Sequence, residues 1–502
     1  MSMRKAVAIA TVLLALVAVS SRRLTTHPAP GDGARVTTAV PAAAPAPAPP
    51  VPFGPLDAAA GARFAAVSTL LNEAVAAGEL PGAVAAIGHG GTVVFHRAYG
   101  ERKLAGEPGL DGSPAPAEPM TEDTVFDMSS LTKCLATATV VMQLYEQGRV
   151  RLDDPLQAYL PGFNPANDPQ RAKVTVRTLL THTSGEPGDV DLADPWGLDR
   201  PDKTEGIRRA LTTPLQSVPG AGFRYSDINF VLLGALIEQV TGDAEDVYVQ
   251  QHVFAPLGMK DSRYLPTAKA CGPHTLSGAA VTWSAPAGRA PAACPAGAWR
   301  TSLLPRIAPT ARDEESAADP GRNPDYGRLL RGAVDDPTAR RMGGVAGHAG
   351  VFSTAHDVSV YAQALLDRLA GRPSTFPLKR ATLELMTSPE QPGHAPGQLE
   401  AANDALRSAA ARYPAVRGQN LRGLGWDIDT GYSVPRGLVF PVGSFGHTGF
   451  TGTSLWMDPG SDTYVLLLSN AIQVRGSPPT TNLDGKVATA AARALRLYGA
   501  AR

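Results

Sequence analysis

The segment from Phe126 to Gln147 limits the fold more than any other, because it is apolar on almost every side of a helix. Between Asp127 and Glu146 its only charged residue is Lys133. Apolar residues recur along it at steps of three and four, namely Leu131, Leu135, Ala138, Met142 and Tyr145. This spacing predicts a helix that is buried nearly all round. The core of the protein must therefore be built around this segment.

Lys133 has no obvious route to water in such a helix. Burial disfavours the charged amine, so the lysine should lose proton affinity or be held by polar partners. Ser130 lies three residues earlier on the same face, in the first turn, where free N–H groups and the helix dipole favour negative charge. A hydroxyl, a base and a donor-rich helix start are the parts of a nucleophilic serine site. The alternative is that Ser130 caps the helix and Lys133 extends to the surface.

The size and charge of the chain limit what it can do. With 502 residues, 43% of them hydrophobic, it can bury a large core in one domain or in two lobes. Lysine and arginine together number 46, as do aspartate and glutamate. No basic field is left to attract nucleic acid, so we expect no nucleic acid partner.

The first 55 residues have the composition of an export segment and a tether. Residues 1–20 begin with Arg4 and Lys5, continue as an apolar run over 6–19 and end in small residues, which is a secretory signal pattern. Residues 21–55 are rich in proline and alanine, a composition that stays extended and cannot build a core. We expect an exported protein, in the periplasm, in the cell envelope or secreted. The alternative is an uncleaved leader that tethers the protein to the membrane.

The folded body is expected between residues 56 and 499. Local patterns predict helices at 56–77, 126–147, 174–181, 227–241, 355–369 and 483–497, and hairpins of 83–88 with 92–98 and of 453–457 with 463–469. Residues 266–305 are predicted to be loop. Strands at both ends with helices between them indicate an α/β fold. The edges of its sheet are expected to come from the two ends of the body, which together form an α/β lobe of residues 56–125 and 420–499. Residues 126–420 are expected to form a helical lobe.

The three cysteines have different surroundings. Cys134 directly follows Lys133 and is most simply a small core residue, with a reactive thiol as the alternative. Cys271 and Cys294 bracket a loop rich in Pro, Gly and Ala. Outside the cytoplasm they could form a disulfide worth about 3 kcal/mol in the loop-entropy treatment. The sequence leaves that pairing open.

Three short motifs stand in order along the body. They are Ser130-Leu131-Thr132-Lys133, Tyr225-Ser226-Asp227 and His447-Thr448-Gly449. Longer blocks agree with them: TVFDMSSLTK, LLTHTSG, FRYSDINFVLLG, GGVAGHAGVFSTA and GHTGFTGTSLWMDP. Over about Leu56 to Gly499, the chain resembles the serine penicillin-recognising superfamily, in the branch of class C β-lactamases, D-alanyl-D-alanine carboxypeptidases and related esterases. The resemblance implies a β-lactamase-like fold, with an antiparallel sheet flanked by terminal helices, and a hydrolase that needs no metal or other cofactor.

The resemblance also gives the motif residues their roles. Ser130 becomes the acylated nucleophile, Lys133 its proton acceptor, and Tyr225 the group that passes protons to the leaving group and activates the deacylating water. A free tyrosine titrates at about pH 10. Tyr225 therefore needs nearby positive charge, which Lys133 and a protonated His447 would supply.

The strand edge that follows His447 is expected to bind substrate. The resemblance implies an oxyanion hole formed by the backbone N–H groups of Ser130 and Phe450. Thr448 belongs to the same edge, and glycine at position 449 would let a substrate backbone approach it closely.

Each of these residues also has a structural interpretation. Tyr225 could pack with its hydroxyl satisfied, and His447 could be a strand-edge histidine bonded to backbone. His182 and His348 stand in turns rich in glycine and hydroxyls, and we interpret both as structural, since nothing in the sequence places them beside the nucleophile.

Two motif residues depart from the β-lactamase pattern. Asp227 replaces an asparagine, so it cannot donate an amide hydrogen bond to a substrate carbonyl, and its charge tends to raise the pKa of Lys133. His447 replaces a lysine and is only partly charged near neutrality, which makes it a weaker anchor for a substrate carboxylate. Both changes disfavour β-lactam turnover.

The sequence therefore favours an esterase or a cell-wall peptidase. The expected partner is a small-molecule ester, a β-lactam or a peptidoglycan stem peptide. A true class C β-lactamase and a penicillin-binding sensor that does not turn over are the alternatives. An α/β-hydrolase would need a G-x-S-x-G elbow and a zinc hydrolase clustered histidines, and the sequence has neither.

Overall fold

The part of the chain described in this computed structural model comprises residues 53, 58–265, 274–277, 280–283, 303–407, 413–414, 418–474 and 481–500. The predicted export segment, nearly all of the Pro/Ala-rich linker, and both Cys271 and Cys294 lie outside the described residues. Within the described part, no helix combines the length and the apolar composition that crossing a membrane would require.

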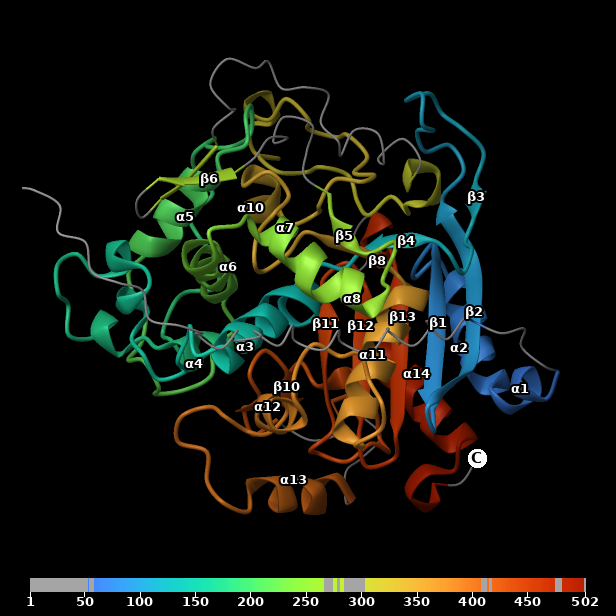
Figure 1. The fold of residues 1–502 in the computed structure, drawn as a ribbon. Coiled ribbons are helices and arrows are strands. Elements are labelled where there is room, and N and C mark those ends of the chain that lie inside the picture. Colours follow the sequence, from blue (N-terminus) through green and yellow to red (C-terminus); the bar gives the residue numbers. More distant parts are fainter. Residues whose placement is uncertain are drawn as a thin grey trace, which may run out of the picture. The chain divides into compact units, whose positions relative to one another are not determined.

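The largest sheet has eight antiparallel strands in the order β3-β2-β1-β13-β12-β11-β10-β9 (Figure 1). Its strands are β1 (Gly82–His89), β2 (Thr92–Lys103), β3 (Glu118–Pro119), β9 (Leu421–Arg422), β10 (Asp427–Asp429), β11 (Phe445–Gly449), β12 (Thr453–Asp458) and β13 (Thr463–Ser469). The predicted hairpins are confirmed as β1 with β2 and β12 with β13. The edge strands β3 and β9 come from opposite ends of the body, as the sequence predicts.

Most helices come from the middle of the chain. They are α1 (Ala58–Arg63), α2 (Ala65–Ala76), α3 (Thr139–Glu146), α4 (Val176–Leu180), α5 (Lys203–Thr212), α6 (Asp227–Thr241), α7 (Glu245–Val249), α8 (Ala255–Leu257), α10 (Pro337–Arg341), α11 (Ala355–Leu369), α12 (Arg380–Met386), α13 (Gln398–Arg407) and α14 (Thr481–Ala494). The bounds predicted for α6 and α11 are confirmed. The hydroxyl of Thr354 caps α11 by accepting the N–H of Asp357, and Gly242 ends α6 with a φ of 81°.

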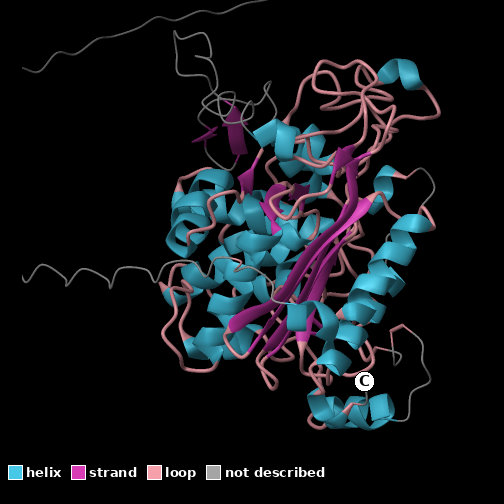
Figure 2. Cartoon of the chain, turned by 90° about the vertical axis from the view of Figure 1, so that its right-hand side faces the viewer, coloured by secondary structure: helices cyan, strands magenta, loops and turns pink. Residues whose placement is uncertain are grey.

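Helices cover both faces of the large sheet (Figure 2). In β1, Val84 and Ala86 belong to the core cluster that the sheet shares with the helices of the middle. The alternate residues Ala83, Ala85 and Ile87 belong to a second cluster, to which α2 and α14 contribute. Successive side chains of a strand point to opposite faces. Because both faces are covered, β1 is apolar throughout instead of alternating.

The segment 126–147 differs from its prediction at its start. Phe126 and Asp127 belong to a strand in a small sheet of order β4-β8-β5, formed by β4 (Val125–Asp127), β8 (Val351–Thr354) and β5 (Arg263–Tyr264). Periodicity alone cannot separate a short buried strand from a buried helix, which explains the error. The helix begins at Leu131, runs as a π-helix over Lys133–Ala138 and continues as α3. Every side chain from 133 to 144 is buried, so the predicted burial is confirmed.

The region 266–305 is not entirely loop. Its described residues include an antiparallel hairpin of β6 (His274–Ser277) and β7 (Ala280–Trp283). Strands of four residues are too short to stand out from surroundings rich in Pro and Gly, so the loop prediction is wrong there.

Candidate active site

Ser130 stands between a strand and a helix. It follows β4 and directly precedes the helix that begins at Leu131. Ser129, the residue before it, has a φ of 47°, in the left-handed region that residues other than glycine seldom adopt. A carboxylate oxygen of Asp127 accepts the N–H of Ser129 at 2.9 Å and holds this turn. Strain of this kind persists only where the surroundings fix it, and it clusters at functional sites.

Lys133 is fully buried, and its amine has three polar partners. Its Nζ lies 3.0 Å from Oγ of Ser130 and 3.0 Å from the carbonyl oxygen of His348. A carboxylate oxygen of Asp227, the first residue of α6, lies 2.7 Å from the same nitrogen. Of the two outcomes expected for a buried lysine, the structure has the one in which polar partners hold it.

The charge state of Lys133 follows from these partners. Burial lowers the pKa of the amine and is the largest single cause, but the charge of Asp227 and the further effects of Asp227 and Tyr225 together outweigh it, and the net pKa is raised. The structure therefore has the second of the two expected outcomes, and the raised pKa has the direction expected from the charge of Asp227. At neutral pH the resting amine is an ammonium that donates to the Ser130 hydroxyl.

Tyr225 reaches the same point from the loop before α6. Lys133 Nζ lies 5.1 Å from the centre of its ring, and both Lys133 and Ser130 are close enough to affect the pKa of its phenol. Burial raises the pKa of the phenol, and the charge of Lys133 only partly offsets this. The sequence-based expectation of a lowered pKa is wrong in its net direction, so the resting phenol keeps its proton.

His447 lies on β11 with its ring centre 5.9 Å from that of Tyr225. Its pKa is held well below 6.5, first by burial and then by the charges of Arg422 and Lys133. Its Nδ1 lies 2.7 Å from the carbonyl oxygen of Thr448. Because a carbonyl only accepts, this nitrogen carries the proton. His447 is therefore neutral and does not supply the charge that the sequence analysis expected of it.

Two histidines interpreted as structural lie closer to the site than expected. The ring of His182 stacks on Tyr225 with centres 4.4 Å apart, and its Nδ1 accepts the N–H of Ser226 at 3.1 Å. His348 offers its backbone carbonyl to Lys133. Both side chains are buried and neither needs to react. They support the residues that carry the chemistry.

The strand edge after His447 lies beside the nucleophile. The N–H of Phe450 donates to Oγ of Ser129 at 3.1 Å, so this predicted oxyanion donor is occupied in the resting site. The Phe450 side chain is 62% exposed. A Cβ at Gly449 would lie 2.6 Å from the carbonyl oxygen of Met128. Glycine is thus required there by the protein's own backbone, not only by an approaching substrate.

A cavity of about 180 Å³ opens onto the Ser130 hydroxyl. Six of its lining residues are predicted site residues: Ser130, Tyr225, His447, Thr448, Gly449 and Phe450. No motif in the sequence pointed to the other five: Arg422, Asp427, Tyr432, Gly452 and Asp484. Lys133 and Asp227 are not part of the lining. Asp227, predicted as a substrate residue, contacts the Lys133 amine in the resting site. Within the described residues, no three His, Cys, Asp or Glu side chains are grouped to hold a metal ion.

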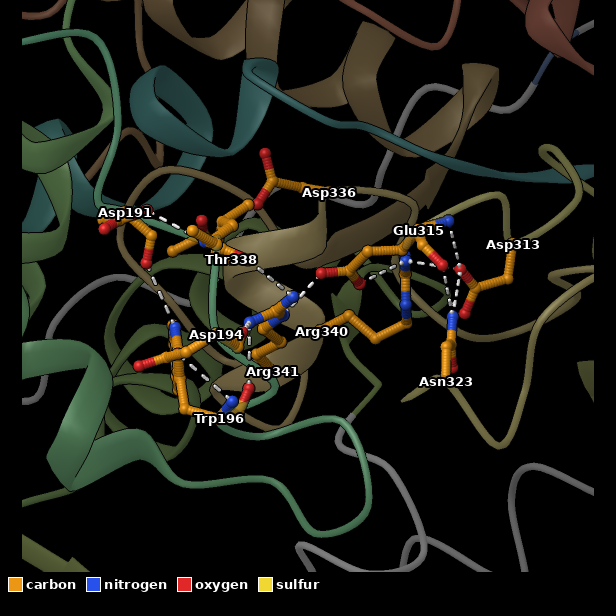
Figure 3. Close-up of polar contacts among 12 residues, drawn as sticks. Asp191, Asp194, Trp196, Asp313, Glu315, Asn323, Asp336, Thr338, Arg340 and Arg341 are labelled. Carbon is orange, nitrogen blue, oxygen red and sulfur yellow. Dashed lines mark hydrogen bonds and ion pairs between the residues drawn. The ribbon is translucent and has the colours of Figure 1, made fainter. Parts of the chain in front are cut away.

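A polar network around α10, part of which is shown in Figure 3, connects the segments that hold two partners of Lys133, His348 and Asp227. Asp336 lies 2.8 Å from Nε2 of His348 and caps α10 by accepting the N–H of Ala339. In the same helix, the hydroxyl of Thr338 donates to both carboxylate oxygens of Asp189, at 3.0 and 2.9 Å. The backbone carbonyl oxygen of Gly188, next to Asp189, accepts the N–H of Asp227 at an N···O distance of 2.6 Å. The segments that deliver the carbonyl and the carboxylate to Lys133 are thereby joined.

Arginines hold the outer part of this network. Figure 3 shows Arg340 and Arg341 of α10 directed towards acidic residues and backbone of the neighbouring loops. Arg340 contacts Asp313 at 3.2 Å and Glu315 at 3.1 Å. Arg341 donates to the carbonyl oxygens of residues 192, 194 and 196. The loop over 189–198 is thus fixed against α10.

Cys134 behaves as the sequence predicts. It is buried, and its Sγ donates to the carbonyl oxygen of Gly425 at 3.1 Å. Burial raises the pKa of the thiol far above its ordinary value, so the reactive-thiol alternative receives no support.

Comparisons with known proteins agree with the fold. A protein of Escherichia coli (strain K12), named provisionally as a D-alanyl-D-alanine carboxypeptidase, is 28% identical over 391 residues, which cover 75% of each chain. The solved structure of simvastatin synthase (LovD) from Aspergillus terreus is 22% identical, with a TM-score of 0.57 over 87% of this chain and 99% of its own. EstCE1, described as a hydrolase with promiscuous acyltransferase activity, is 20% identical, with a TM-score of 0.56 over 86% of this chain and 100% of its own.

The family follows from a match to a family model. The model of the Beta-lactamase family matches residues 67–478, which is most of the chain. The large antiparallel sheet with helices on both faces is the fold of that family. The chain therefore belongs to the Beta-lactamase family, the serine hydrolases with the β-lactamase-like fold.

Proposed function

We propose that the protein forms a covalent acyl-enzyme on Ser130 from an ester or amide substrate and then hydrolyses it. The observation that carries this proposal is the 3.0 Å contact between the Ser130 hydroxyl and the buried Lys133 amine at the N-terminal end of a buried helix. A hydroxyl becomes a nucleophile when a base within hydrogen-bond reach takes its proton. The Tyr225 phenol beside both groups is a second proton carrier.

The proposed reaction begins with loss of a proton from the Lys133 ammonium to solvent. The Ser130 oxygen then attacks the substrate carbonyl carbon, and its proton passes to the neutral amine. Tyr225 protonates the leaving group and regains a proton from Lys133. Water attacks the acyl-enzyme by the reverse route and releases the acid.

The negative charge that develops on the carbonyl oxygen needs donors. The N–H groups of Ser130 and Phe450 are the candidates. The Phe450 N–H becomes available when the substrate displaces the Ser129 hydroxyl that it now contacts.

An ester or a cell-wall stem peptide suits this site better than a β-lactam. Asp227 is paired with Lys133 and, as a carboxylate, has no hydrogen to donate to a substrate carbonyl. His447 is neutral and so a weak anchor for the carboxylate of a penicillin. The provisional carboxypeptidase name of the bacterial relative and the hydrolase description of EstCE1 support the same range.

The acyl-enzyme is tested by covalent labelling. A fluorophosphonate probe should add one adduct to the wild-type protein, and peptide mass mapping should locate it on Ser130 and not on Ser129. The Ser130→Ala variant should lose the adduct while its circular dichroism stays unchanged. An adduct of normal yield on Ser130→Ala would show that the nucleophile is misassigned.

The substrate range is tested with two chromogenic compounds. We expect slow turnover of nitrocefin beside much faster hydrolysis of p-nitrophenyl butyrate, because the two motif changes remove β-lactam contacts but not the nucleophile. Labelling with a fluorescent penicillin, followed over time, separates turnover from permanent acylation. Turnover of nitrocefin that is faster than hydrolysis of p-nitrophenyl butyrate would indicate a β-lactamase. A permanent label with no ester hydrolysis would indicate a receptor.

A further inference from the structure

Glu245 is a buried residue whose carboxyl group contacts the segments that hold Lys133. It is the first residue of α7 and is fully buried. Its Oε1 lies 2.8 Å from the hydroxyl oxygen of Thr137, which belongs to the same π-helix as Lys133. A Cβ on Gly234 of α6 would lie 2.6 Å from Oε2 of Glu245 and 3.0 Å from the backbone nitrogen of Gly347. The carboxyl group is therefore packed against α6 and lies close to the turn that contains Gly347.

The hydroxyl of Thr137 has two oxygen neighbours and only one proton. Its oxygen lies 2.8 Å from Oε1 of Glu245 and 2.7 Å from the carbonyl oxygen of Gly347. It can donate to only one of them, and two oxygens at such a distance with no proton between them repel each other. The carbonyl of Gly347 has no proton to give. Both contacts are therefore satisfied when Glu245 is protonated and donates to Thr137, which in turn donates to Gly347.

The surroundings of Glu245 also favour a neutral carboxyl group. Its Oε2 has no hydrogen-bond partner among the described residues, and a buried carboxylate with an unpaired oxygen is unfavourable. Burial raises the pKa of Glu245 to about 7, against the opposing charge of Lys203. Lys203 of α5 is itself paired with Glu238 of α6, whose charge raises the pKa of Glu245 further.

Four further titratable groups lie in α7 or in elements near it. Asp246, in α7 itself, adds negative charge and also raises the pKa of Glu245. Burial raises the pKa of Tyr264 in β5 far above its ordinary value, so this phenol stays neutral. The Lys133 amine is held by the three partners described above, and the ring of His252 stacks on a tyrosine of α7. Glu245 therefore changes its charge near neutral pH.

We propose that Glu245 is a positioning residue for Lys133, and that its protonated form acts through Thr137 and the turn of Gly347 and His348. The carbonyl oxygen of His348 accepts from the Lys133 amine at 3.0 Å, so the position of this turn sets the position of the amine. When Glu245 loses its proton, its carboxylate takes the single proton of Thr137, because a charged acceptor binds it more strongly than a carbonyl. Gly347 then loses this donor, and the turn holds the amine less firmly.

Glu245→Gln tests this linkage, because the amide of glutamine can donate to Thr137 at every pH. The inference rests on the proposed function, in which Lys133 is the base, so the first measurement is the hydrolysis of p-nitrophenyl butyrate as a function of pH. From about pH 6 to about pH 8.5, the ratio of kcat/KM for the variant to that for wild type should rise about fivefold, the effect of one hydrogen bond. A constant ratio over this range would overturn the assignment.

Substitutions of Thr137 show whether the effect passes through its hydroxyl. Thr137→Val keeps the shape of the side chain but cannot join the two oxygens. In a Thr137→Val background, the ratio of rates with and without Glu245→Gln should therefore stay constant with pH. Thr137→Ser keeps the hydroxyl, and in that background the ratio should rise as in wild type. An equal rise with and without the hydroxyl would show a long-range effect of charge and would overturn the linkage.

Glu186→Gln is the matched control for the loss of a buried glutamate. Glu186 is also fully buried, and burial raises its pKa to about 8, but its charged neighbour is Arg171, at 3.9 Å. The ratio of rates for Glu186→Gln and wild type should stay constant over the same pH range. A rise as large as that for Glu245→Gln would show that the effect is not specific to Glu245.

Hydrogen–deuterium exchange measures the turn without turnover. After correction for the intrinsic effect of pH, the peptide spanning residues 345–351 should exchange faster at the higher pH in wild type, and at equal rates in Glu245→Gln. Faster exchange in wild type alone, with no ester hydrolysis at any pH, would overturn the proposed function and keep the linkage. Ester hydrolysis with equal exchange in both proteins at both pH values would do the reverse.

Discussion

A Lys133→Met variant is expected to fold and to lose about a thousand-fold in kcat/KM for ester hydrolysis, the usual contribution of a positioned proton acceptor. Lys133 is the base in contact with the Ser130 hydroxyl, at 3.0 Å. Methionine fills the same buried space but cannot take the proton, so the Ser130 oxygen stays a weak nucleophile. Initial rates with p-nitrophenyl butyrate, together with a fluorophosphonate labelling rate, measure the effect.

The chain offers a matched control for this substitution. Lys203 is also a buried lysine paired with a carboxylate, that of Glu238, but it lies in α5 and has no contact with Ser130. Lys203→Met should lower the melting temperature and leave the rate of the folded fraction unchanged. General-base catalysis contributes a factor of at least about 100 to the rate. If Lys133→Met keeps more than about a tenth of the wild-type rate, the loss is too small, and Lys133 is not the proton acceptor.

An Asp227→Asn variant is expected to become active at lower pH than the wild type. The active form of Lys133 is the neutral amine, and its pKa is raised by Asp227, so the wild-type rate should climb with pH through the neutral and mildly alkaline range. Removing the carboxylate charge should lower that pKa by about one to three units. The rising limb of the rate profile should move down by the same amount, so that the variant exceeds the wild type at pH 7.

The same substitution should cost stability in a defined pH range. A group whose pKa is raised on folding contributes stability that is complete below its unfolded pKa and lost as pH rises through the folded value. The ordinary pKa of the lysine amine is 10.5, so the difference in melting temperature between wild type and Asp227→Asn should be full at neutral pH and shrink only as the pH rises above 10.5. A rate profile that stays in place, or moves to higher pH, would contradict this account of Lys133.

The parts of the fold that were predictable are those fixed by local sequence. Gly242 ends α6 and Thr354 caps α11, so both helices have their predicted bounds. The two hairpins follow from apolar runs on either side of a tight turn. The spacing of Ser130 and Lys133 also sufficed to place a hydroxyl and an amine on one helical face, and the structure puts them in contact.

The charge states could not be predicted in the same way. They depend on groups that arrive from distant segments, and several of these leave no pattern in the sequence. The carbonyl oxygen of His348 that accepts a hydrogen bond from Lys133 belongs to the backbone. Because every residue has such a carbonyl, the residue type at position 348 could not predict this contact. The pKa of His447 is lowered first by burial and then by the charge of Arg422, yet Arg422 stands 25 positions earlier and shares no motif with His447. Burial and pairing were therefore judged from side-chain type alone, and the expectations of a lowered pKa for Tyr225 and of a charged His447 were wrong.

The π-helical stretch over Lys133–Ala138 lets the two ends of the buried segment orient their side chains independently. In a π-helix each N–H reaches back five residues instead of four, so side chains before and after it no longer share one angular phase. The side chains of α3 can then keep the orientation about the helix axis that packing against their apolar neighbours requires. The Lys133 side chain can take the different orientation that its three polar partners require. Within one continuous helix, the packing of the core and the direction of the reactive amine can therefore be changed independently of each other.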